Sequence, residues 1–210
     1  MRDTGKNLRI AVFGHATAKH LSEPTLQWTE TLGILIADAG ATLYTGGGGG
    51  VMLAARRGCL AHGGAIVSVN PEMDISGDIA RSRCLGSVIA AGQGKLGRVH
   101  LLTQSIDLGF AVGGGAGTLL EIVACYLLAK PVVVVNGFQS DKDPCVDALL
   151  TRRTEELIAG VPVMSGCIDA KDIGQVCPVR VCPKSLSPEV VFRIGLEAWL
   201  ARGVKSNRMA

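Results

Sequence analysis

Short, mostly apolar runs alternate along this chain with longer amphipathic stretches, a pattern typical of alternating strands and helices. The apolar runs predict strands at 8–13, 41–44, 65–69, 87–90, 108–112 and 131–135. The amphipathic stretches predict helices at about 22–40, 51–62, 95–104, 118–129, 145–158 and 187–201. Apart from one strand, residues 72–94 show no clear pattern, and residues 161–186 are expected to be irregular.

Strands that are apolar throughout and alternate with helices are typical of a parallel sheet that is buried on both faces. The chain has 210 residues and contains neither a linker-like stretch nor an internal repeat, so one nucleotide-binding domain spanning residues 1–210 is expected. The predicted fold class is α/β, a Rossmann-like parallel sheet with helices on both faces. Ligands of such sheets bind beyond the carboxyl ends of the strands, where we expect the functional site.

Glycines follow three of the predicted strands at these ends. After 108–112 come four glycines and then a helix, whose free N–H groups and positive dipole end form an anion site. Gly46 to Gly50 follow 41–44, and five successive glycines carry an entropic cost that a simple tight turn would not require. A histidine after the first strand could contact a ligand or only be polar surface. The predicted phosphate- and nucleotide-binding residues are Gly14, His15, Gly47, Gly48, Gly49, Gly114, Gly115, Ala116, Gly117 and Thr118.

Glu121 falls in the expected first turn of the helix beside this anion site. Cleavage of a nucleotide's N-glycosidic bond needs both features, because the phosphate must be held while positive charge develops on the neighbouring ribose. Thr118 and Glu121 also fit a capping box, in which Thr118 is the N-cap and Glu121 its reciprocal partner. The sequence leaves the capping and catalytic interpretations open, and the two are compatible.

The common phosphate-binding motifs do not match. A Walker A loop ends in Gly-Lys-Ser/Thr, and neither glycine run has a lysine there. The dinucleotide fingerprint G-x-G-x-x-G/A also fails, because Gly113 and Gly115 lead to Thr118. A P-loop NTPase and an NAD dehydrogenase are therefore disfavoured.

Composition narrows the remaining classes. The net charge is +3 with scattered basic residues, so nucleic-acid binding is not favoured. The seven cysteines and an N-terminus without a secretion signal suggest reduced thiols in a cytoplasmic protein. Cys177 and Cys182 lack a second pair at matching spacing, which disfavours a metal site. Charges and Pro131 interrupt the longest apolar stretch, 119–135, so no membrane span is expected.

The motif Gly-Gly-x-Gly-Thr-x-x-Glu at 114–121 resembles the signature of the LOG (Lonely Guy) family, long described as "lysine decarboxylase-like". The segment 44–52 is similar to that family's Tyr-Gly-Gly-Gly loop, and the resemblance covers roughly residues 8–160. It implies hydrolysis of a nucleoside 5′-monophosphate, such as a cytokinin ribotide, to the free base and ribose 5-phosphate. It also implies a dimer that needs no cofactor.

Two residues match catalytic positions of this family. Glu121 corresponds to the family's glutamate, and Arg98 to the arginine of its Met-His-x-Arg-Lys segment, although an exposed helical arginine is the simpler interpretation of Arg98. The chain departs from the family pattern at Lys95-Leu96, Val99 and Gly113. These departures bring it closer to a sister branch, the molybdenum-cofactor carrier proteins, which bind a phosphate-bearing pterin without chemistry. A non-catalytic carrier is therefore the alternative function.

The predicted helix 118–129 is apolar nearly all round, wider than the stripe needed to cover one sheet face. Such a helix needs a second apolar cover, and a partner subunit would provide it. We therefore expect a homodimer or larger homo-oligomer with the pocket near the interface. The alternative is that residues 166–185 fold over this helix.

Overall fold

The computed structural model describes residues 8–72, 85–138, 150–168 and 179–206. The strands are β1 Arg9–Gly14, β2 Thr42–Thr45, β3 Ile66–Asn70, β4 Ser87–Ala90, β5 Leu108–Val112, β6 Val132–Asn136, β7 Leu150–Ile158, β8 Val161–Ile168 and β9 Val179–Pro183. The helices are α1 Glu23–Asp38, α2 Gly50–Ala61, α4 Gly94–Ser105, α5 Ala116–Leu127 and α6 Pro188–Ser206, with a short 3₁₀ helix at Ala18–His20.

All nine strands form one sheet, in the order β4-β3-β2-β1-β5-β6-β9-β8-β7. The pairings from β4 to β9 are parallel, and β8 runs antiparallel to both of its neighbours. The strand order reverses at β1, which pairs with β2 on one side and β5 on the other. The crevice at such a reversal is the usual ligand site of doubly wound sheets. The predicted α/β Rossmann-like fold is confirmed.

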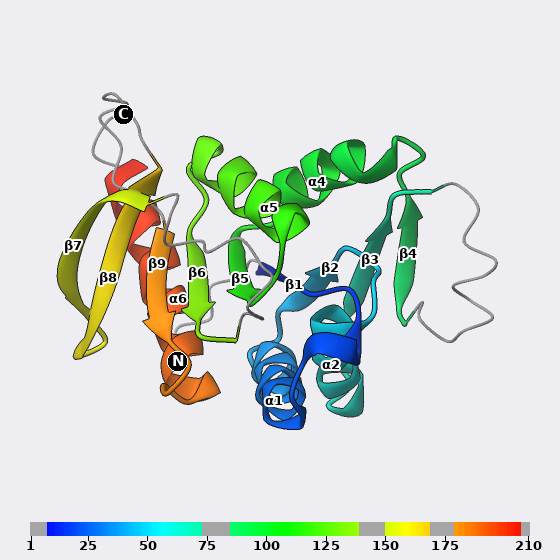
Figure 1. Cartoon of the computed structure of the whole chain (residues 1–210), viewed down its shortest axis with the longest axis horizontal. Coiled ribbons are helices and arrows are strands. Elements are labelled where there is room, and N and C mark those ends of the chain that lie inside the picture. The colour runs from blue at the N-terminus through cyan, green and yellow to red at the C-terminus, as the bar shows by residue number, and fades with distance from the viewer. Residues whose placement is uncertain (1–7, 73–84, 139–149, 169–178, 207–210) are drawn as a thin grey trace.

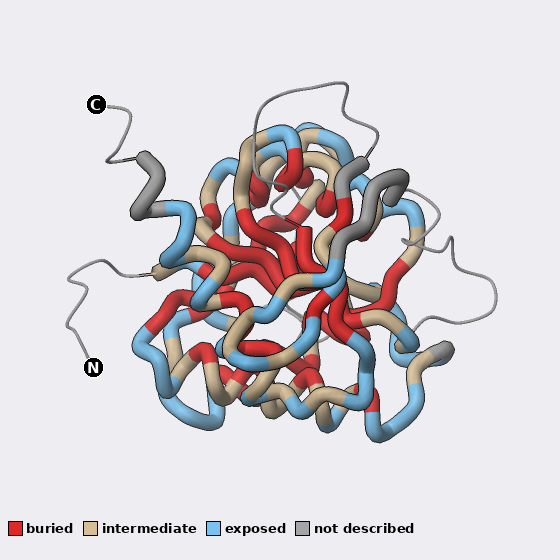
Figure 2. The backbone as a smooth tube through the Cα atoms, turned by 90° about the vertical axis from the view of Figure 1, so that its left-hand side faces the viewer, coloured by how far each residue is buried: buried red, intermediate tan, exposed pale blue. Residues whose placement is uncertain are grey.

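Helices cover both faces of the sheet (Figure 1). α4 and α5 lie on one face, where Phe13 and Ile122 belong to one apolar cluster. α1, α2 and α6 lie on the other, where Leu32 and Phe110 belong to a second. Figure 2 shows that the buried backbone is concentrated in the strands between these layers. Burying one such side chain contributes about 1.5–3 kcal/mol, so the two clusters hold the strand ends in place.

Helices α1 and α2 approach backbone to backbone. A Cβ atom placed on Gly33 would lie 2.0 Å from the carbonyl oxygen of Ala55, and one on Gly58 would lie 2.0 Å from that of Glu30. Only glycine allows this approach. This close contact between α1 and α2 positions the N-terminus of α2. It therefore also positions the loop Gly46–Gly50, which leads into α2.

The region after β6 differs from the prediction. Residues 145–158 were expected to form a helix, but residues 150–158 form strand β7, and 145–149 lie outside the described residues. The segment expected to be irregular contains β8 and β9. β7 pairs with β8 over nearly its full length, and β8 pairs with β9. β7 and β8 form a hairpin joined at Ala159-Gly160, so cross-strand hydrogen bonding overrides the weak helical pattern of 150–158.

The limits of the predicted domain remain a prediction, because residues 1–7 and 207–210 lie outside the described residues. Within the described part of the chain, no helix is long and apolar enough to cross a membrane.

Candidate functional site

Three loops meet at the carboxyl ends of the central strands. They are Gly14–Thr17 after β1, Gly46–Gly50 after β2 and Gly113–Gly117 after β5. The first two are joined by a hydrogen bond from the backbone N–H of Val51 to the carbonyl oxygen of His15, at 3.0 Å. The structure therefore brings the three predicted glycine segments to one edge of the sheet.

The loop after β2 is tightly seated. Gly47 has φ +76°, and a Cβ atom on it would lie 1.6 Å from Oδ1 of Asn70. A Cβ on Gly49 would lie 2.8 Å from the carbonyl oxygen of Ala16 in the neighbouring loop. No other residue type fits Gly47, because the backbone conformation and the Asn70 side chain both exclude a Cβ.

The loop after β5 ends at the N-terminus of α5. Gly115 is the N-cap, Ala116 and Gly117 form the exposed start of the helix, and Thr118 is buried against Gly114. The first N–H groups of a helix have no acceptor within it, so those of Ala116 to Thr118 are suited to hold an anion.

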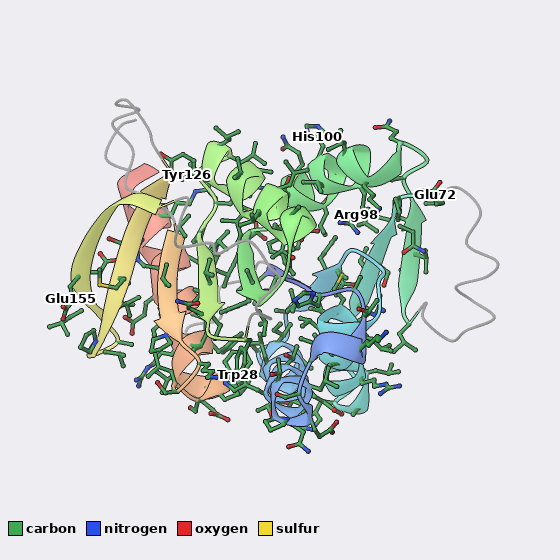
Figure 3. All side chains as sticks on the ribbon, in the orientation of Figure 1. Trp28, Glu72, Arg98, His100, Tyr126 and Glu155 are labelled. Carbon is green, nitrogen blue, oxygen red and sulfur yellow. The ribbon has the colours of Figure 1, made fainter. Side chains whose placement is uncertain are left out.

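Arg98 and Glu121 form an ion pair at the centre of this arrangement. Nη2 of Arg98 donates to Oε1 of Glu121 at 3.0 Å, and Nη1 donates to the carbonyl oxygen of Gly46 at 3.4 Å. The side chains of Arg98 and Glu121 are 15% and 4% exposed. Figure 3 shows Arg98 on the sheet side of α4, with His100 on the opposite side. Residues from α4, α5 and the loop after β2 thus meet at one point.

Two interpretations from the sequence are corrected by this geometry. The capping box is wrong, because α5 begins two residues earlier than Thr118 and Gly115 is its N-cap. Glu121 therefore lies in the second turn of the helix, where its carboxylate faces Arg98. The simpler interpretation of Arg98 as an exposed helical residue is also wrong. Both side chains point inward because α4 and α5 pack against one another over the sheet.

Burial raises the pKa of Glu121 to about 7, although the positive charge of Arg98 acts to lower it. The carboxyl group therefore titrates near neutral pH, as a general acid or base must. Burial also raises the pKa of the Cys125 thiol to about 12, and the Glu121 charge adds to this effect. Cys125, one turn further along α5, is consequently a poor nucleophile.

His15 is placed at the same edge. A Cβ on Gly113 would lie 3.6 Å from the His15 ring and 2.8 Å from the carbonyl oxygen of Phe138. His15 is half-buried between the loops after β1 and β5. All of the predicted site residues thus lie in one region, at the carboxyl ends of the central strands.

Two buried polar residues beneath the site were not predicted. Asn70 ends β3 and is 1% exposed, and Arg56 lies within α2 and is fully buried. In the sequence, Asn70 and Pro71 mark only the end of a strand, and Arg56 belongs only to a short basic pair with Arg57. An arginine surrounded by the small apolar residues of helix 51–62 is the one signal that could have identified Arg56.

From the sequence, a metal site at Cys177 and Cys182 is disfavoured, and only Cys182 of this pair lies within the described residues. Cys59, Cys125 and Cys182 are buried free thiols, whereas Cys177 lies outside the described residues. Among residues with a described placement, no three His, Cys, Asp or Glu side chains form a cluster that could hold a metal ion.

Comparison with known proteins agrees with this picture. An uncharacterized protein of Archaeoglobus fulgidus is 34% identical over 146 residues, which are 66% of this chain and 91% of that protein. The molybdenum cofactor carrier protein of Chlamydomonas reinhardtii is 30% identical, and its structure matches 64% of this chain and 78% of its own with a TM-score of 0.53. The X-ray structure of a protein named TM1055 is 22% identical and matches 87% of this chain and 94% of its own, with a TM-score of 0.62, a likeness of fold alone.

The model of the SLOG cluster4 family matches residues 7–161, a span that includes all three loops, Arg98 and Glu121. The resemblance found in the glycine motifs is thereby confirmed at the level of the family, near the molybdenum-cofactor carriers. This chain belongs to the SLOG cluster4 family.

Proposed function

We propose that this protein hydrolyses the N-glycosidic bond of a nucleoside 5′-monophosphate, giving the free base and ribose 5-phosphate. The observation that carries the proposal is the position of Glu121. Its carboxyl group is buried, has a pKa of about 7 and lies one turn beyond a helix N-terminus suited to phosphate. Cleavage of a 5′-phosphoribosyl bond needs both features, because the phosphate must be held while positive charge develops on the ribose.

In this proposal the N–H groups of Gly114 to Thr118 hold the phosphate. The C1′–N bond lengthens, positive charge develops on the ribose ring, and ionised Glu121 stabilises that charge. A water molecule then adds through its oxygen to C1′, and Glu121 orients it and accepts its proton. The electron pair of the broken bond leaves with the base, which takes up a proton to give the neutral free base. Arg98, which contacts Glu121, binds the phosphate or assists the departing base.

The direct test is to incubate the protein with a panel of nucleoside 5′-monophosphates, including modified adenines, and to measure ribose 5-phosphate. Glu121→Gln keeps the shape of the side chain and removes its charge, so turnover should fall by roughly a hundredfold or more. Glu189→Gln, an exposed change on α6, is the matched control. A Glu121→Gln variant with wild-type turnover would exclude Glu121 from the chemistry.

A specific observation favours a second candidate, a non-catalytic carrier. The chain is 30% identical to a molybdenum cofactor carrier protein whose structure matches 64% of this chain. A carrier would use the same anion-binding N–H groups to hold a phosphate-bearing pterin. Tight binding of the molybdenum cofactor, with no ribose 5-phosphate from any monophosphate, would favour the carrier over the hydrolase.

We also propose that the active form is a homodimer or larger homo-oligomer in the cytoplasm, with the pocket near the interface. The alternative cover for α5 was the segment 166–185. Residues 179–183 of that segment instead form β9 within the sheet, and 169–178 lie outside the described residues. Leu96 on α4 and Leu127 on α5 are 72% and 69% exposed. A second subunit that packs on α4 and α5 would cover such exposed leucines.

A further inference from the structure

Arg56 is the largest fully buried side chain among the described residues. It lies in the second turn of α2, directly beneath the loop Gly46–Gly50. Burying a guanidinium group is unfavourable unless its N–H groups find acceptors in a suitable geometry. The acceptors of Arg56 therefore show what its burial achieves.

The guanidinium group joins three segments. Nη1 donates to Oγ1 of Thr45 at the end of β2 and to Oγ of Ser68 in β3, each at 3.1 Å. Nη2 donates to the carbonyl oxygen of Gly48 at 2.5 Å. Arg56 thus connects the glycine loop to the two strands beneath it. The planar guanidinium group can donate to these acceptors at the same time because Nη1 and Nη2 point in different directions.

The bond to Gly48 also sets the direction of the next N–H group. In a trans peptide the C=O and N–H groups of one unit point in opposite directions, and the described residues contain no cis peptide. Because the Gly48 carbonyl points down to Arg56, the N–H of Gly49 points away from it. Gly48 and Gly49 are the partly exposed glycines of this loop, whereas Gly46, Gly47 and Gly50 are buried.

We propose that Arg56 is the positioning residue of this loop, and that it makes the loop selective for phosphate-bearing ligands by presenting the Gly49 N–H to an anionic oxygen. The inference rests on the proposed function only in that a phosphate group binds at this edge of the sheet. It does not require that the nucleotide is hydrolysed. Arg56 itself does not touch the ligand.

The experiment compares wild type with Arg56→Met, Arg56→Lys and, as the matched control, Arg57→Met, which removes the exposed neighbouring arginine on the same helix. Binding of AMP and of adenosine is measured by calorimetry, and thermal unfolding monitors the fold. Loss of one hydrogen bond to a charged group should weaken AMP binding roughly ten- to a hundredfold in Arg56→Met. Adenosine binding should be unchanged, which a general loss of structure would not produce.

Arg56→Lys keeps the charge and loses the fork, so it should also weaken AMP binding about tenfold or more. Wild-type AMP affinity in Arg56→Lys, or an equal loss of AMP and adenosine binding in Arg56→Met, would overturn the proposal. If Arg56→Met does not fold, Ser68→Ala removes one anchor of the guanidinium and should weaken AMP binding severalfold without affecting adenosine. An unchanged ratio of AMP affinity to adenosine affinity in Ser68→Ala would also overturn the proposal.

Amide NMR with inorganic phosphate separates this inference from the proposed function. In wild type, the Gly49 N–H and the N–H groups of Gly114 to Thr118 should respond to phosphate, whereas in Arg56→Met the Gly49 response should be lost and the others retained. A protein that shows these responses but hydrolyses no monophosphate supports the inference and refutes the hydrolase. A protein that hydrolyses a monophosphate while Gly49 fails to respond refutes the inference alone.

Discussion

The raised pKa of Glu121 predicts that the protein loses stability as the pH rises from 4.5 to about 7. In the folded state the carboxyl group keeps its proton up to about pH 7, because burial disfavours the charged form more than Arg98 favours it. In the unfolded state the group ionises near its ordinary value of 4.5. The stabilisation from this difference is fully present below 4.5 and is lost as the pH rises to about 7.

The size of the effect follows from the two pKa values. A rise from 4.5 to about 7 corresponds to about 3 kcal/mol, at about 1.4 kcal/mol for each tenfold change in proton affinity. A protein of this kind has a free energy of unfolding of about 5–15 kcal/mol, so the effect is a large fraction of the total. A glutamine at this position cannot titrate, so Glu121→Gln should not show this pH-dependent loss of stability.

The assay is urea unfolding of wild type and Glu121→Gln between about pH 4.5 and about pH 8. The difference in free energy of unfolding between the two should change by about 3 kcal/mol in favour of the variant as the pH rises. Glu189→Gln is the control, because hydrogen bonds from Ser187 and the backbone lower the pKa of the exposed Glu189, the opposite direction to that of Glu121. A constant difference between wild type and Glu121→Gln would refute the reasoning.

The same titration should affect catalysis in the opposite direction. Stabilisation of a positively charged ribose needs the ionised carboxylate, so kcat/KM of the proposed hydrolase should rise as the pH increases through about 7. Stability and activity are then expected to change in opposite directions over one pH range. A pH-independent kcat/KM between about pH 6 and about pH 8 would separate Glu121 from the rate-limiting step.

Three further predictions concern packing and assembly. Gly33→Ala should lower the free energy of unfolding by about 1–3 kcal/mol, because the added Cβ would lie 2.0 Å from the Ala55 carbonyl oxygen; an unchanged urea midpoint would contradict the backbone contact. Lys130→Met should cost about 1–3 kcal/mol in the same assay, because the Lys130 ammonium donates to the carbonyl oxygens of Thr103, Gln104 and Ile106 at 2.6–2.7 Å and holds the end of α4. Leu127→Glu should convert the proposed dimer to a monomer in light scattering, since a charge would replace an exposed leucine at the interface; a strictly monomeric wild type with full activity would rule the dimer out.

The sequence by itself determined strands β1 to β6, which are all parallel. The apolar runs at β1, β2, β3, β5 and β6 are each followed by glycine, proline or a helix start, so local pattern was enough to identify them. The glycine segments also placed the site at the carboxyl ends of the strands. Local sequence carries this information because periodicity and glycine content act within a few residues.

Only the tertiary structure decided the remainder of the fold. Strands β7, β8 and β9 became strands because they pair with one another and with β6, and no periodicity within 150–158 distinguishes a strand from a helix. Residues 150–158 and 179–183 lack the continuous apolar run of the predicted strands, which is why the prediction failed there.

The site divides in the same way. Glu121 and Arg98 were identified from a motif, but their 3.0 Å contact arises because α4 and α5 pack together across 23 positions of sequence. The pKa of Glu121 and the role proposed for Arg56 both depend on burial, and burial is set by every element that surrounds a side chain. The identity of Glu121 and Arg98 as site residues could therefore be predicted from the sequence. Their contact, their burial and the pKa of Glu121 required the folded chain.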